Sequence, residues 1–283
     1  MSTEPEIRRL SKALFAMAKG ASMLAFAGEA AALMLGAWFA IVHTPEWTSI
    51  TALAGVALVT FVLRGCADAW KEKADEQLRK LDLADGLGQA IAQRDRADIL
   101  ADAPVFASWL ARRRSEDESY FASARPGSPV RLVENLRESA WWTSHLGRTA
   151  EALQRIWLFL FGTLAVGTLI LNVARAGITP TFFTAPTFAV AVLLFLFTNG
   201  PYRRLGEFRA LHEAAARVES DAGHLLDMAE RIDEPRALLL AAQYHLARKG
   251  APLLPAFVWR LRKGTLNRLW EAVAREQIGP AGA

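Results

Sequence analysis

Four apolar blocks separated by charged sequence constrain this chain more than any other feature. They span residues 21–42, 47–63, 156–174 and 182–198. Roughly 20 apolar residues cross a bilayer as a helix, and the shorter blocks reach that length with interfacial flanks. None alternates apolar and polar residues as a half-buried strand would, and four buried helices of this kind would be unusual in a soluble chain. The pattern predicts an all-α membrane protein with four transmembrane helices in two hairpins and helical cytoplasmic regions.

Basic residues orient the two hairpins. Lys and Arg flank the cytoplasmic ends of the blocks, whereas the hairpin tips together carry only Arg175. Because cytoplasmic loops retain Lys and Arg, both termini and the long middle segment are expected inside the cell. The predicted regions are a cytoplasmic N-terminal segment 1–20, a transmembrane hairpin 21–66, a cytoplasmic helical region 67–154, a second hairpin 155–200 and a cytoplasmic C-terminal helical region 201–283.

One carboxylate, Glu29, interrupts the first block. If the membrane helix begins at Ala21, Glu29 lies about 12 Å deep at 1.5 Å per residue. A carboxylate there costs about 2–3 kcal/mol unless it meets a partner, water or a proton. Alternatively, the span runs from about residue 30 to 47, and Glu29 lies at the inner interface. In the first case we expect Glu29 to contribute to a gate or a pore lining.

Small residues recur beside this carboxylate. Gly28, Ala32 and Gly36 are spaced by four and would form a flat stripe on a helix. Such a stripe lets a second helix approach closely, although Ala and Gly are common in membrane helices in any case. We take the stripe, with Glu29, as a candidate helix-packing or pore-lining surface.

Two cytoplasmic stretches hold candidate ligand-binding residues. Asp82 and Asp85 lie three apart, so they would share one helix face and could bind a cation or a ligand hydroxyl. Capping and hydrogen bonds to a neighbouring helix near Gly86 are the alternative. In the stretch 131–142, two arginines could grip a phosphate while one of two tryptophans stacks on a base. The tryptophans could instead belong to an interfacial belt. The four residues are Arg131, Arg137, Trp141 and Trp142.

The remaining cytoplasmic sequence reads as helical and carries no enzyme signature. Leucines at helical spacing predict a helical stretch over residues 67–100, with a break at Gly86 and continuous with the second membrane block. No phosphate-binding loop, zinc-binding helix or nucleophile elbow is present, so we expect neither an enzyme nor a cofactor nor a metal site. The net charge of +4 suits cytoplasmic membrane flanks better than binding to a nucleic-acid duplex.

Three stretches together resemble a known family. They are "LDLADGLG" (81–88), "RLVENLRESAWWTSHL" (131–146) and "YHLARKGAPLLPAFVWRLRKGTLNRLW" (244–270). With the two hairpins, they resemble the SMODS-associated four-transmembrane effectors. The resemblance implies a multi-pass protein of the bacterial inner membrane that serves in anti-phage defence. It also implies that a cyclic oligonucleotide, made by a partner nucleotidyltransferase, triggers membrane disruption and cell death or growth arrest.

The residues themselves are compatible with that function but leave others open. Four helices enclose little water, so a pore would need a homo-oligomer in the lipid bilayer. A constitutive small ion channel or transporter, with Glu29 in the conduction path, is one alternative. A membrane scaffold that recruits a soluble partner is another.

Overall fold

The computed structural model describes residues 4–42, 46–113, 121, 123, 125–176, 201–228 and 232–278. Within these ranges the chain is all-helical and contains no strand, as predicted. The helices are α1 (Glu4–Val42), α2 (Glu46–Leu87), α3 (Gln93–Ala101), α4 (Val105–Arg112), α5 (Pro129–Ala176), α7 (Pro201–Asp227), α8 (Glu234–Lys249) and α9 (Ala256–Ile278). The predicted fourth membrane block, 182–198, lies outside the described residues.

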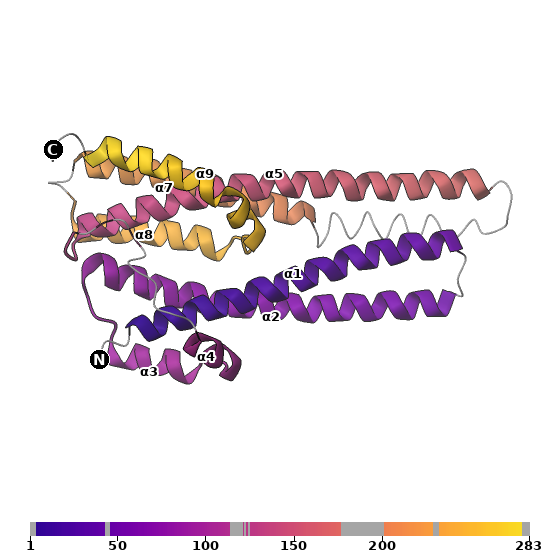
Figure 1. Cartoon of the computed structure of the whole chain (residues 1–283), viewed down its shortest axis with the longest axis horizontal. Helices are drawn as coiled ribbons and strands as arrows, with labels where there is room; N and C mark the ends of the chain where they lie inside the picture. The colour runs from indigo at the N-terminus through magenta and orange to yellow at the C-terminus, as the bar shows by residue number, and fades with distance from the viewer. Residues whose placement is uncertain are drawn as a thin grey trace.

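The long helices lie side by side in an elongated bundle (Figure 1). The antiparallel pair of α1 and α2 lies beside α5, and α5 also packs along α7. The short helices α3, α4, α8 and α9 gather at one end, which also holds the start of α1 and the end of α9. In the part of the chain that the structure describes, the other end consists of the apolar halves of α1, α2 and α5. The apolar and charged parts of the sequence therefore occupy opposite ends of the molecule.

Three helices continue from the apolar end into the charged end without a break. The predicted N-terminal segment is helical from Glu4 onward, as part of α1. The second block extends into a helix of 42 residues, α2, and the third forms the second half of the 48-residue α5. The prediction that the second block leads directly into a charged helical stretch is confirmed.

The apolar end exposes large hydrophobic side chains on several helices. In the described part of the chain, two helical stretches are long and apolar enough to cross a membrane, Glu4–Leu35 and Thr51–Leu87. Only 11% of the apolar window in the second stretch is buried, unlike the core helix of a soluble protein. Phe61 on α2 and Phe159 on α5 are 75% and 74% exposed. Large exposed apolar side chains gathered at one end of a molecule are typical of a membrane or protein contact.

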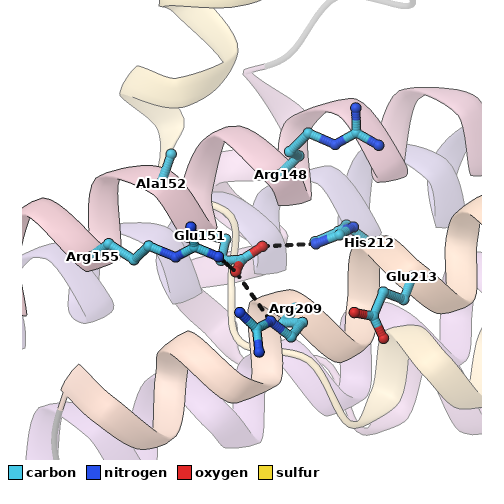
Figure 2. A pocket seen from close by; sticks show the side chains of 7 residues that line it. All are labelled: Arg148, Glu151, Ala152, Arg155, Arg209, His212 and Glu213. Atoms are coloured by element: carbon cyan, nitrogen blue, oxygen red, sulfur yellow. Dashed lines mark hydrogen bonds and ion pairs between the residues drawn. The ribbon is translucent and has the colours of Figure 1, made fainter.

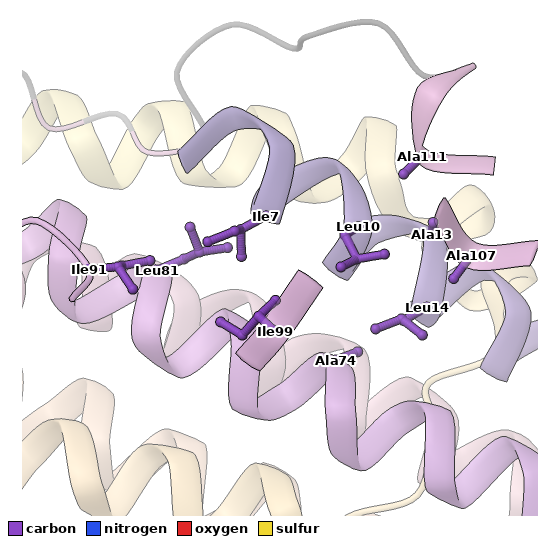
Figure 3. Close-up of a cluster of buried hydrophobic side chains, with 10 residues drawn as sticks. All are labelled: Ile7, Leu10, Ala13, Leu14, Ala74, Leu81, Ile91, Ile99, Ala107 and Ala111. Atoms are coloured by element: carbon purple, nitrogen blue, oxygen red, sulfur yellow. The ribbon is translucent and has the colours of Figure 1, made fainter. Parts of the chain in front are cut away.

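A first hydrophobic core joins α1 and α2 to α3 and α4 at the charged end (Figure 3). Ile7, Leu10 and Leu14 recur at helical spacing on α1 and are almost fully buried. Ala107 and Ala111, one turn apart on α4, pack against this face of α1. Alanines at these positions let α4 lie close, because they add little bulk between the helices.

A second core joins α5, α7 and α8 around Tyr244, which is 1% exposed. Its hydroxyl donates to the carbonyl oxygen of Ser139 at 3.1 Å and lies 2.8 Å from Thr143 Oγ1. Because a buried hydroxyl needs a partner, these bonds fix the position of α8 against α5.

The helical stretch predicted over 67–100 is divided in two, because α2 ends at Leu87 and α3 begins at Gln93. Gly88 has a φ of 70°, which ends the helix in a conformation that favours glycine. Gly127 lies so close that a Cβ on it would be 2.3 Å from Gly88 Cα. The break brings the end of α2 against the start of α5.

Candidate functional site

Glu29 lies at the junction of three helices and is only 5% exposed. Its carboxylate forms an ion pair with Arg64 of α2 and accepts a hydrogen bond from Arg204 of α7, with 2.6 Å between Nη2 and Oε2. The three residues form the Glu29 cluster. Arg64 directly follows the second apolar block, and Arg204 follows the fourth in sequence. The carboxylate is therefore level with the charged end of the second block.

Close approach of α1 and α2 builds this cluster. A Cβ on Gly28 would lie 2.4 Å from Thr60 Oγ1, so only a glycine fits there without displacing Thr60. Thr60 and Arg64 are one turn apart on α2, which brings Arg64 to Glu29. The small-residue stripe thus faces α2 of the same chain at Gly28. Ala32 is half-buried, whereas Gly36 is helical and its surroundings lie outside the description.

A second charged group surrounds Glu151 on α5, which is 4% exposed (Figure 2). Its carboxylate accepts hydrogen bonds from Arg155 on the same helix and from Arg209 on α7. His212 Nε2, also on α7, lies 2.7 Å from Glu151 Oε2. Burial raises the pKa of Glu151, but the hydrogen bonds from Arg155, His212 and Arg209 outweigh it. The pKa is consequently below its ordinary value of 4.5, and the group is an anion at neutral pH.

An open cleft of about 390 Å³ lies over this group, between α5 and α7. We call it the basic cleft. Its lining carries three arginines against two glutamates and consists of Arg148, Glu151, Ala152, Arg155, Arg209, His212 and Glu213. The two helices approach at Gly147, where a Cβ would be 3.0 Å from that of His212. Because Gly147 is one turn before Glu151, this approach brings His212 to the carboxylate.

Arg131 and Asp85 meet where the end of α2 contacts the start of α5. Arg131 Nη2 donates to Asp85 Oδ1 at 3.2 Å, and Nη1 donates to the carbonyl oxygen of Arg125 at 2.7 Å. The amide of Ser128 donates to the carbonyl oxygen of Gly86 nearby. These contacts tie α2 to α5 at the helix end.

Asp82 points elsewhere, into the interface between α2 and α8, beyond the apolar part of α2. It is 6% exposed, and its Oδ2 lies 3.9 Å from His245 Nε2. Burial raises the pKa of Asp82 to about 7, although Arg248 and Arg8 oppose the shift. Burial also lowers the pKa of His245 to about 3, so near neutral pH this histidine carries no charge.

The two tryptophans pack against α9. Trp141 is 5% exposed and lies 5.2 Å from Trp270 between ring centroids, while Trp142 lies 5.1 Å from Trp259. A base could not stack on the buried Trp141 in this arrangement. Arg137 lies beside Gly223 of α7, about 3.8 Å from the position of a Cβ there.

The six predicted ligand residues therefore occupy four separate places and form no common site. Sequence reasoning missed the basic cleft. One signal could have revealed it, because Arg148, Glu151 and Arg155 recur at helical spacing just before the third apolar block. Their partners, Arg209 and His212, are three apart in a distant stretch, and only the fold joins the two sets.

Among the described residues, no group of three or more His, Cys, Asp or Glu side chains could hold a metal ion. Comparison with protein families, curated proteins and solved structures finds none that is significantly similar to the chain.

Proposed function

We propose that this protein is an inner-membrane effector with four transmembrane helices in two hairpins, both termini being cytoplasmic. On receiving a cytoplasmic signal it permeabilises the membrane and arrests or kills the cell. The resemblance in three sequence stretches suggests that the signal is a cyclic oligonucleotide made during phage infection. The alternative, a constitutive channel, would need no signal.

The observation that carries the proposal is the Glu29 cluster at the charged end of the apolar blocks. It joins α1 and α2, of the first hairpin, to Arg204, which follows the second hairpin. Removing one partner of a buried ion pair leaves the other charge uncompensated, which costs several kcal/mol. The cluster would therefore hold the two hairpins together. Permeabilisation would require them to separate or to turn against each other.

In this mechanism Glu29 locks the resting state. The carboxylate lies between helices of one chain, and neutralising it would weaken the link between the hairpins. A signal acts only if it binds the open arrangement more tightly than the closed one. The cytoplasmic helices are continuous with the apolar ones in α1, α2 and α5, so a shift of one end would move the other.

The test is expression in bacteria with a membrane-potential dye and a panel of cyclic nucleotides. We expect expression alone to be tolerated and one nucleotide to collapse the potential. Loss of potential without any nucleotide would favour the constitutive channel. A stable potential across the panel, with the protein verified in the membrane, would reject the effector function.

A further inference from the structure

The basic cleft lies further toward the charged end than the Glu29 cluster does. Arg209 follows Arg204 by five residues on α7, which is about 7.5 Å along the helix axis. Arg155 immediately precedes Ile156, the first residue of the third apolar block. Each headgroup layer of a bilayer is about 5–8 Å thick. With the apolar blocks in the membrane, the cleft therefore lies among the phosphates of the inner leaflet.

The chemistry of the cleft suits a phosphate anion. Arg155 and Arg209 are 58% and 55% exposed, so their guanidinium groups are accessible from solvent or lipid. Arg148 also lines the cleft and is exposed. Guanidinium groups bind phosphate oxygens through paired, charge-assisted hydrogen bonds. Three of them exceed what Glu151 and Glu213 neutralise.

We propose that the basic cleft binds the phosphate of an anionic lipid headgroup. Its depth favours a lipid over a soluble phosphate compound, although both present the same phosphate chemistry. Glu151 holds Arg155 and Arg209 in place and competes with the phosphate for them. The inference rests on the proposed insertion of the apolar blocks into a membrane and does not depend on a nucleotide trigger.

The experiment uses the full chain in nanodiscs of phosphatidylcholine, with or without phosphatidylglycerol. Co-purification with the nanodisc is measured first, so a failure of membrane insertion is recognised separately. The thermal midpoint is then compared between the two lipid compositions, and native mass spectrometry in detergent measures the affinity for phosphatidylglycerol. Inorganic phosphate and a cyclic dinucleotide are added to phosphatidylcholine nanodiscs as the soluble arms.

Phosphatidylglycerol should raise the midpoint of the wild type, and the double variant Arg155→Gln/Arg209→Gln should lose that shift. Each single variant should weaken lipid binding about tenfold or more, the effect of one hydrogen bond to a charged group. Arg217 is an exposed arginine of α7 that lies outside the cleft, so Arg217→Gln is the matched control and should behave like the wild type. Glu151→Gln should bind several-fold more tightly, because it keeps an acceptor and removes the competing charge.

Equal phosphatidylglycerol dependence in the double variant and the control would overturn the site. A shift of the same size from inorganic phosphate or the cyclic dinucleotide, absent in the double variant, would overturn the lipid as its occupant. Unchanged or weaker binding by Glu151→Gln would reject the competition. Circular dichroism at low temperature verifies that every variant retains its helix content.

Discussion

Replacing Glu29 by Gln should destabilise the resting protein substantially. Glu29 is 5% exposed and binds two arginines, of which Arg204 is 15% exposed and Arg64 is 32% exposed. Glutamine keeps the shape of the side chain and one acceptor but removes the ion-pair partner of the better-buried Arg204. Removing one partner of a buried pair typically costs 3–5 kcal/mol, and the remaining acceptor and partial exposure of Arg64 favour the lower end, about 3 kcal/mol. For a chain of this size that lowers the midpoint by about 6–12 °C.

The assay is thermal unfolding of the purified protein in detergent, followed by circular dichroism for Glu29→Gln, Arg204→Gln and the double variant. The double variant should lose about 2 kcal/mol less than the sum of the single variants, because each single change already breaks the shared contact. Leu33→Ala, on the same face of α1, controls for loss of packing and should not couple to Arg204→Gln. A Glu29→Gln midpoint within about 2 °C of the wild type, or additive losses, would refute the lock.

Three further predictions concern the charged end. Burial raises the pKa of Asp82 in the folded protein from 3.8 to about 7, so the free-energy cost of burying its charge grows as the pH rises through that range. Asp82→Asn should therefore stabilise the protein by up to about 4 kcal/mol above pH 7 and by almost nothing below pH 4. Denaturant unfolding at these two pH values measures the difference. Gly147→Leu should force α7 away from α5 and lower the midpoint by several degrees. Gly167→Leu on the same helix is the control, since none of the described residues has an atom within 4 Å of a Cβ there. Equal effects of the two substitutions would contradict the close-approach argument. Trp270→Ala should release α9 and lower the free energy of unfolding by up to about 3 kcal/mol, because the Trp141 contact is lost. Earlier proteolysis of the C-terminal region would detect this release. Unchanged proteolysis would show that the Trp141 contact does not hold α9.

The sequence was most informative where apolar runs and charge set the structure directly. The continuation of the second apolar block into the charged half of α2 followed from the spacing of its leucines. Pairings between distant segments did not, because one chain reveals a helix face but not its neighbour. Asp82 and Asp85 illustrate this, since their shared spacing suggested one site and the fold sends them to different helices. Glu29 was conspicuous from the start, but its two arginines follow it by 35 and 175 residues.

The length of α5 has a mechanical consequence. Its 48 residues make one rod of about 72 Å, and the first half is packed against α7 and α8. A tilt of about 5° around the middle displaces each tip by about 3 Å, more than half the rise of a helical turn. Leverage of this kind converts a small rearrangement at one end into a change of helix spacing at the other, with no residue of the rod changing conformation. Inserting a flexible glycine pair at its midpoint should uncouple the two ends while leaving each end folded.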